Sequence, residues 1–251
     1  MMAVFGVQNR LKLNRISGSA DLNINFLAGI WLICILVLPA CSRLPEDMSM
    51  IPKGEFIMGN NTGDSNENPE RKVYLNDFFM DKYEVTNEAY LRFVKQAKHG
   101  EPKEWQVYGY MEDKKNHPVV FVSFDDALGY CNWLGKRLPT EEEWEKAARG
   151  TGGYIYPWGN EFELGKANTS LSGIVGTTEV GMYEGGRSPY GLYDMAGNIW
   201  EWTSSTYIDK EKAVKGGSWG LSHKLARTFT RIGYEPGTKT NNIGFRCAKD
   251  R

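Results

Sequence analysis

From Gly150 to the C-terminus, the sequence has no helical spacing of apolar residues, and glycines interrupt its short apolar runs. A loop-rich segment of this length is uncommon in a compact domain unless something other than a regular backbone ladder orders it. The chain contains 8 Trp, 13 Tyr and 11 Phe, which can form aromatic clusters, and its 28 Gly suit tight turns. These features exclude a helix bundle and predict an irregular domain held by side-chain packing.

Helical spacing is confined to the residues before Gly150. Thr86 precedes apolar residues at helical spacing and predicts an N-capped helix that ends near Ala97. Capping boxes predict a second helix that begins at Ser123 and a third over residues 141–149. Short strands are expected over residues 56–59 and 73–80. The spacing turns seven side chains of the second and third helices inward: Ala127, Tyr130, Cys131, Leu134, Trp144, Ala147 and Ala148.

An uncharged apolar run occupies residues 26–40 and follows a basic stretch. The run is too short to span a bilayer comfortably, because a spanning helix needs about 20 apolar residues, but it is typical of a signal peptide. It ends in Leu38-Pro39-Ala40-Cys41, which resembles the lipobox of bacterial lipoproteins. The alternative is an uncleaved membrane anchor in which Cys41 is an incidental thiol.

Cleavage at this point predicts a signal peptide over residues 1–40, lipidation of Cys41, a polar tether over 41–49 and one domain over 50–249. The membrane would then be a partner through the lipid anchor. Ser42 after the lipidated Cys resembles the sorting pattern for the outer membrane of a Gram-negative bacterium. The formal net charge is −1 and no basic patch stands out, which argues against nucleic acid as a partner.

The four cysteines differ in their places along the chain. Cys34 lies in the expected signal peptide and Cys41 at the lipid site, so Cys131 and Cys247 remain in the domain. Two thiols in an oxidising compartment predict a disulfide. The alternative is a pair of buried free thiols.

Eight motifs follow one another between Met50 and Lys249. They occupy residues 56–59 (FIMG), 82–87 (KYEVTN), 117–120 (HPVV), 135–145 (GKRLPTEEEWE), 156–160 (YPWGN), 191–202 (GLYDMAGNIWEW), 216–219 (GGSW) and 244–247 (GFRC). In this order they resemble the motifs of formylglycine-generating enzymes, also called sulfatase-modifying factors. The resemblance implies an α/β fold related to C-type lectins, with low regular secondary structure and long loops. It also implies a disulfide between Cys131 and Cys247, the pair that the cysteine count reached independently.

The motif that runs from Asp194 to Glu201 offers two carboxylates with a glycine between them. Oxygen ligands with no His or Cys nearby favour Ca²⁺ over zinc or copper. By resemblance, the side chains of Asp194 and Glu201 and the carbonyls of Gly197 and Ile199 would bind a structural calcium ion. The alternative is that the two carboxylates pair with Arg or cap turns.

The family's second calcium site maps less well onto this chain. Asn168 and Thr169 match its first ligands, but the acidic ligand falls near Ser172, where a hydroxyl replaces a carboxylate. Because that charge is lost, we expect one good calcium site and at most one poor one.

In the oxidising members of the family, two cysteines shortly after the GGS motif bind copper and activate oxygen. Here the two positions fall on or near Leu221 and Ala226, and no Cys lies between Cys131 and Cys247. Copper(I) prefers soft thiolate ligands, so copper is not expected as a cofactor. The sequence thus identifies no catalytic residue of the family.

Other catalytic chemistry has little support. Some relatives carry a three-histidine iron site in a separate domain, whereas His99, His117 and His223 are widely spaced here. A lone loop histidine such as His223 is more often solvated than catalytic. The recurring arginines of the family, Arg227, Arg231 and Arg246, are expected to form structural ion pairs.

These observations favour a non-catalytic module of the cell envelope that binds a protein, a peptide or a glycan. One alternative is an oxidase or protein-modifying enzyme with a different metal site. Another is a scaffold component of a secretion or motility machine, for which the sequence offers no residue-level signature.

Overall fold

The computed structural model describes residues 47–251. The expected signal peptide and the lipidation site at Cys41 therefore lie outside the described residues. The first strand, β1 (Met48–Ile51), takes up the last two residues of the expected tether, because it pairs with β4 (Phe78–Asp81). Within the described residues, no helix is long and apolar enough to cross a membrane.

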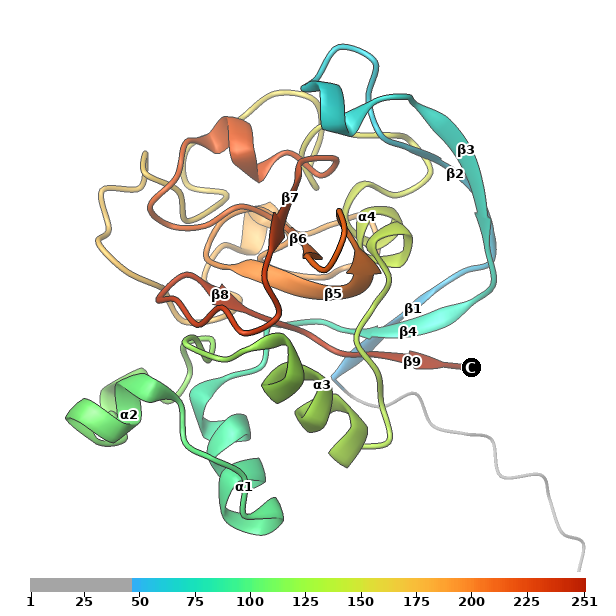
Figure 1. Cartoon of the computed structure of the whole chain (residues 1–251). Coiled ribbons are helices and arrows are strands. Elements are labelled where there is room, and N and C mark those ends of the chain that lie inside the picture. The colour runs from blue at the N-terminus through green and yellow to red at the C-terminus, as the bar shows by residue number, and fades with distance from the viewer. Residues whose placement is uncertain (1–46) are drawn as a thin grey trace, which may run out of the picture. The chain divides into compact units, whose positions relative to one another are not determined.

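Three small sheets make up the β-structure of residues 47–251 (Figure 1). In the first, β4 lies between β1 and β9 (Ala248–Asp250), so residues from both ends of the domain meet in one sheet. The second is a hairpin of β2 (Gly54–Met58) and β3 (Arg71–Leu75). The third has the order β7-β6-β5-β8 and comprises Arg231–Tyr234, Lys212–Lys215, Trp200–Thr206 and Ile243–Gly244.

The helices of the first half begin where their caps predict. The Thr86 side chain accepts the N–H of Ala89 at the start of α1 (Asn87–Ala97). Capping boxes open α3 (Phe124–Trp133) and α4 (Glu141–Arg149), so all three predicted helices are confirmed. A fourth helix, α2 (Lys103–Tyr108), was not predicted, because it is short, has no side-chain cap and buries only Trp105.

The main core lies between α1, α3 and the four-stranded sheet. Tyr90 of α1 stacks on Tyr130 of α3 with ring centroids 5.7 Å apart, and Phe245 packs edge-on against both rings. Ala127, Tyr130 and Cys131 are buried as predicted. The prediction for Leu134 is wrong: the helix ends at Trp133, and Leu134, at the cap, is 41% exposed.

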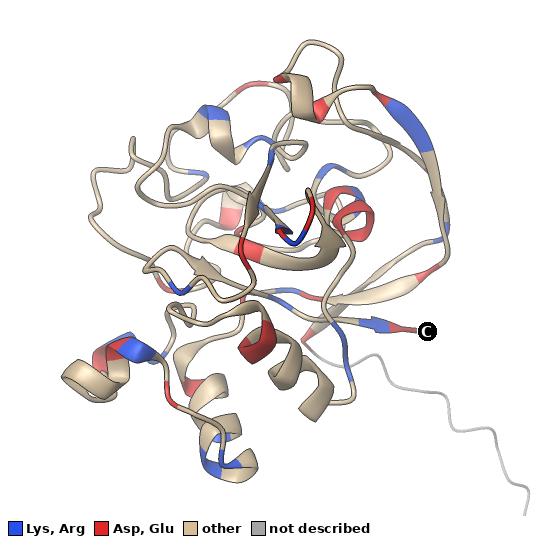
Figure 2. Ribbon diagram, viewed as in Figure 1, with Lys and Arg blue, Asp and Glu red and all other residues tan. Residues whose placement is uncertain are grey.

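A second core forms around α4, whose Trp144, Ala147 and Ala148 are fully buried as predicted. Acidic residues also gather on this helix (Figure 2). The carboxylate of Glu145 is buried and accepts bonds from the Arg149 guanidinium and the Lys215 ammonium group, each at 2.9 Å. Because Lys215 belongs to β6, this charge cluster fixes α4 to the central sheet.

Between α4 and β5, the only regular helix or strand is a short 3-10 turn, η3 (Glu184–Gly186). In this segment, side-chain amides make hydrogen bonds in place of the backbone ladders of a regular sheet. The side-chain Oδ1 atom of Asn198 accepts the backbone N–H of Thr178 at 2.9 Å. The backbone N–H of Asn198 donates to the backbone carbonyl of Asn168 at 2.8 Å. The prediction of long irregular loops in an α/β fold is thus confirmed, and buried polar side chains are what order the loops.

Candidate functional site

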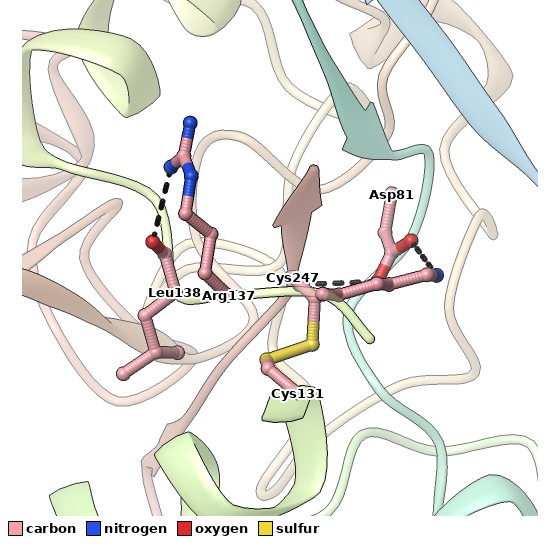
Figure 3. The surroundings of a disulfide bond; sticks show 6 residues. Asp81, Cys131, Arg137, Leu138 and Cys247 are labelled. Atoms are coloured by element: carbon pink, nitrogen blue, oxygen red, sulfur yellow. Dashed lines mark hydrogen bonds and ion pairs between the residues drawn. A yellow bond between two sulfur atoms is a disulfide. The ribbon is translucent and has the colours of Figure 1, made fainter. Parts of the chain in front are cut away.

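The disulfide between Cys131 and Cys247 is confirmed (Figure 3). It joins the last turn of α3 to the residue before β9, and both cysteines are fully buried. The Asp81 carboxylate accepts the backbone N–H of Cys247 at 3.0 Å and also pairs with Lys136. Residues 47–251 contain no other cysteine, so this part of the chain has no free thiol.

The two positions of the family's copper thiolates hold packed apolar side chains. Leu221 packs against the main core, and Ala226 is 1% exposed and contacts Ala167 and Ala196. Between them the chain forms a short 3-10 helix, η4 (His223–Ala226), whose N-cap is the Ser222 side chain. Residues 221–226 therefore offer no thiolate ligand.

Three residues of the predicted calcium loop adopt a backbone conformation that glycine, asparagine and aspartate tolerate better than other residues. Asp194, Gly197 and Asn198 all have a positive φ, of 56°, 79° and 59° respectively. A Cβ atom at position 197 would lie 2.2 Å from the Asn168 carbonyl oxygen, so only glycine fits there. The backbone of this loop therefore passes close to Asn168 at position 197.

Internal partners already engage both carboxylates of the predicted site. Glu201 is fully buried and accepts two bonds of 2.7 Å from the Arg246 guanidinium and one of 2.8 Å from the Trp144 indole N–H. Asp194 accepts the N–H of Gly181 at 2.6 Å. These are the contacts of the alternative interpretation, an arginine pair and a turn cap, and the calcium site stays a prediction.

Sequence reasoning missed a third buried carboxylate beside this loop, that of Glu84. Its Oε2 atom accepts the side-chain N–H of Asn198 at 2.6 Å, and its Oε1 atom has no hydrogen-bond partner. Burial, followed by the nearby charges of Asp194 and Glu201, raises the pKa of Glu84 well above its usual value. Burial also raises the pKa of Asp194 to about 6. Glu84 lies in the KYEVTN motif, but only the fold brings it to residues 194–201.

The charge balance of this cluster fits a divalent cation. Glu84, Asp194 and Glu201 carry three negative charges when ionised, and Arg246 is the cation that acts on them. Two negative charges would be left in the interior if all three were ionised, and the raised pKa values of Glu84 and Asp194 favour their neutral forms when no cation is bound. In the part of the chain that the structure describes, no three His, Cys, Asp or Glu side chains surround one cation position. The predicted ligand set does not need three, because it combines two carboxylates with two carbonyls.

The residues of the weaker calcium site are satisfied among themselves. The Asn168 Oδ1 atom accepts the Ser172 hydroxyl at 2.8 Å, and the Asn168 amide donates to the Gly176 carbonyl at 3.0 Å. Thr169 is fully buried beside them. A hydroxyl in place of the family's carboxylate thus closes a local hydrogen bond, and the prediction that this site is poor at best remains untested.

The histidines lie in separate places. His99 pairs with Asp126, the His117 ring contacts the Thr177 hydroxyl, and the His223 ring stacks on Phe162 at 4.6 Å. Burial lowers the pKa of His117.

The arginines of the recurring family positions all form ion pairs. Arg227 pairs with Glu67, and Arg231 pairs with Glu141. Arg246 is the partner of Glu201.

An apolar pocket of about 240 Å³ lies beside the copper positions. Its walls include Phe162, Leu164, Ala167, Leu171 and Tyr183. The Ser170 N–H donates to the Leu221 carbonyl at 2.9 Å, and Phe162 contacts His223, so the pocket adjoins the segment 221–226. Two of its apolar side chains are exposed, Leu164 at 74% and Leu171 at 51%.

Comparison with known proteins agrees with the motifs and the fold. The family model of the sulfatase-modifying factor enzyme 1-like domain matches residues 36–251. Inactive C-alpha-formylglycine-generating enzyme 2 of Mus musculus is 33% identical, over 86% of this chain and 92% of that protein. The formylglycine-generating enzyme of Mus musculus is 31% identical, over 81% of this chain and 75% of that protein. The solved structure of PvdO from Pseudomonas aeruginosa superimposes with a TM-score of 0.71 at 25% identity, covering 81% of this chain and 94% of that one. This chain therefore belongs to the sulfatase-modifying factor enzyme 1-like domain family, which is the family of the formylglycine-generating enzymes.

Proposed function

We propose that this protein is a non-catalytic member of its family, a lipoprotein of the cell envelope whose domain binds a peptide segment of another protein. The observation that carries the proposal is that no cysteine lies between Cys131 and Cys247, so the copper-binding positions, which by resemblance fall on or near Leu221 and Ala226, hold no thiol. Hydrocarbon side chains cannot coordinate Cu(I), which needs soft sulfur ligands. Without that metal, the oxygen-dependent oxidation of a substrate thiol has no site here.

The relatives alone do not separate the two functions. One similar protein is named as inactive and another as a formylglycine-generating enzyme, at nearly equal identity. Our choice between the two functions rests on the residues at the copper positions, since a fold can be kept while two side chains change. The disulfide and the buried charge clusters are made by other residues of the domain, and none of them uses the side chain of Leu221 or Ala226.

The pocket beside the lost copper positions supports a role in binding. An apolar side chain of a peptide would fill the space between Phe162, Leu171 and Tyr183, and the backbone of the surrounding loops offers hydrogen-bond groups. Leu164 and Leu171 line the pocket and are exposed, so they present apolar surface to a partner. A peptide with one or two apolar anchors suits this shape.

Calcium and the membrane anchor complete the proposal. A calcium ion bound near residues 194–201 would neutralise the excess charge of the buried carboxylates and stabilise loops that have no regular backbone hydrogen-bond ladder.

Lipidation of Cys41 would hold the domain at the membrane, in keeping with the apolar run and lipobox of the leader. Radiolabelled palmitate should enter the wild-type protein in cells and be absent from Cys41→Ser.

Copper binding and aldehyde formation test the absence of catalysis. The full chain would carry Cys34→Ser and Cys41→Ser, since those thiols could bind copper without belonging to the domain. We expect no stoichiometric Cu(I) and no aldehyde on a thiol-bearing peptide. The same chain with Leu221→Cys and Ala226→Cys is the matched control, because it restores sulfur donors to the segment. Aldehyde formation by the chain without these two cysteines would refute the proposal.

Peptide selection tests the binding role. A random peptide library displayed on phage and selected on the full chain should yield a consensus with apolar anchors. Binding of that peptide should be lost in Leu171→Glu and kept in Val107→Glu, because Val107 is exposed on α2 and does not line the pocket. A selection with no consensus, or a consensus peptide that binds Leu171→Glu as well as wild type, would contradict the pocket as the binding site.

A further inference from the structure

Another pocket lies at the end of the domain that is opposite the copper positions. It has a volume of about 420 Å³ and lies between the start of β1, the first half of α1 and the end of α3. Tyr130, Trp133 and Leu134 form its apolar wall. Figure 1 shows α1 and α3 at the bottom of the domain and the orange-red coil of η4 at the top. This pocket and residues 221–226 are therefore far apart.

The polypeptide enters the domain at the rim of this pocket. Asp47, the first residue that the structure describes, lines the pocket together with Trp133 and Leu134. Only residues 42–46 separate Asp47 from the predicted lipidation site at Cys41. A fully extended chain from residue 41 to residue 47 spans at most about 22 Å. A lipid on Cys41 would therefore keep this end of the domain close to the membrane surface.

Trp133 and Leu134 are held in place but only partly covered. The Trp133 ring packs against Phe93 at 5.5 Å and against Tyr130 at 5.9 Å, and yet the residue is 36% exposed. Leu134 is the C-cap of α3 and is 41% exposed. Trp is enriched where a protein meets the boundary between water and lipid, because its ring is apolar and its N–H is polar. An exposed Trp and Leu side by side suit such a boundary.

The exposed charges around the pocket are balanced, so its rim is apolar rather than cationic. Lys136 pairs with Asp81, and Arg92 pairs with Glu88 at 3.6 Å. Asp47 adds a negative charge. This balance gives no attraction to anionic lipids, whereas an exposed indole and an exposed leucine gain free energy when they leave water. A lipid surface of any headgroup charge therefore fits the rim.

We propose that Trp133, Leu134 and the rim of this pocket rest on the lipid surface, with both side chains inserted among the headgroups. This inference rests on the lipid anchor of the proposed function. The short tether brings the rim to the membrane, and the two apolar side chains hold it there. The domain then presents residues 221–226 and the adjoining peptide pocket away from the membrane, toward a partner (Figure 1).

A nitroxide label at position 134 tests the contact with lipid. The lipidated full chain with Cys34→Ser has no free thiol, because its other cysteines are acylated or joined in the disulfide. Leu134→Cys then places one label at the rim. Leu164→Cys is the matched control, since Leu164 is also an exposed leucine but lines the pocket beside residues 221–226.

The label is measured in vesicles of phosphatidylcholine that hold the lipidated protein. At position 134 we expect frequent collisions with dissolved oxygen, which concentrates in lipid, and few collisions with a water-soluble nickel complex. At position 164 we expect frequent collisions with the nickel complex. Both results should be unchanged at high salt and with added phosphatidylglycerol, because the contact does not depend on net charge.

Fluorescence quenching by brominated phosphatidylcholine is a second measurement that needs no new thiol. Bromine in the acyl chains quenches only a nearby indole, so part of the wild-type fluorescence should be lost in these vesicles. Trp133→Phe should remove most of this quenching, and phenylalanine keeps an aromatic ring beside Phe93 and Tyr130. Trp158→Phe is the control and should leave the quenching in place, since Trp158 packs in the cluster of Ala226.

The outcomes distinguish this inference from the lipid anchor. If palmitate does not enter the wild-type protein, the anchor is wrong and the membrane contact with it. If palmitate enters and the label at 134 meets the nickel complex as often as the label at 164, only the membrane contact is wrong. Protection of position 134 from both oxygen and nickel would indicate a protein on this surface and would equally refute the contact with lipid.

Discussion

Removal of the disulfide should be the most costly covalent change in this domain. The bond joins cysteines 116 residues apart in the sequence. In the chain-entropy model, closing a loop of 116 residues stabilises the folded state by about 4.8 kcal/mol at 25 °C, because it restricts the unfolded chain. That figure is a large share of the roughly 5–15 kcal/mol by which a domain is stable.

The variant to make is Cys131→Ala with Cys247→Ala. Alanine is preferred to serine, because both positions are fully buried and a hydroxyl there would lack a partner. The Asp81 carboxylate can still accept the backbone N–H of residue 247, so the local hydrogen bond survives the change. Loss of the two sulfur atoms removes some packing as well, which adds to the entropic effect.

Urea unfolding followed by tryptophan fluorescence measures the loss. We expect the free energy of unfolding to fall by about 4–5 kcal/mol and the m-value to rise, because an unfolded chain without the loop exposes more surface. Both proteins should carry Cys34→Ser and Cys41→Ser so that no other disulfide forms. A loss below about 1 kcal/mol with an unchanged m-value would refute the chain-entropy reasoning for this loop.

Two further changes test the architecture of the buried site, and a third tests the ion pairs of Asp126 at the start of α3. Glu201→Gln leaves a buried guanidinium without its carboxylate and should lower the free energy of unfolding by about 3–5 kcal/mol in urea. Gly197→Ala should lower the free energy of unfolding by about 2 kcal/mol or more, since its Cβ would meet the Asn168 carbonyl oxygen. Gly173→Ala is the control and should cost about 1 kcal/mol, because Gly173 has a similar φ but nothing near its Cβ position. Equal losses would argue against the close contact at Gly197. Burial acts to raise the pKa of Asp126, but its hydrogen bonds and ion pairs outweigh burial and lower that pKa to about 2. Ionised Asp126 therefore stabilises the folded state fully above the unfolded pKa of about 4. The difference in free energy of unfolding between wild type and Asp126→Asn should shrink as the pH falls from about 4 to 2. A constant difference would show that the carboxylate charge does not contribute.

The elements that local rules determine could be predicted from the sequence. α1, α3 and α4 begin at Thr86, Ser123 and Thr140 because each cap is a contact between residues three apart. The disulfide followed from counting cysteines and from the family's pattern. In contrast, α2 has neither a capping side chain nor more than one buried residue, so no local signal marks it.

The buried site could be predicted only in part, because its charges come from distant segments. Asp194 and Glu201 share a motif, so their proximity was readable in the sequence. Glu84 and Arg246 enter the same cluster from other parts of the chain, since Arg246 is 45 residues from Glu201 and Glu84 is 114 residues from Asn198, and no spacing rule connects them. The arginine pair was foreseen as an alternative for Glu201, whereas the unpartnered oxygen of Glu84 became visible only in the fold.

The contacts that order the loops do not involve the side chain of Leu221 or Ala226, so the fold is compatible with the proposed absence of copper. The copper positions lie on the segment 221–226, where Leu221 joins the main core and Ala226 contacts two other alanines. The order of the loops depends instead on Asn198, which bonds to Thr178, to Glu84 and to the Asn168 carbonyl. Apolar side chains at positions 221 and 226 therefore remove none of the hydrogen bonds that Asn198 makes, and they add apolar contacts to the core. If the pocket beside this segment binds a peptide, as we propose, the apolar residues at positions 221 and 226 leave the stabilising contacts of the domain in place.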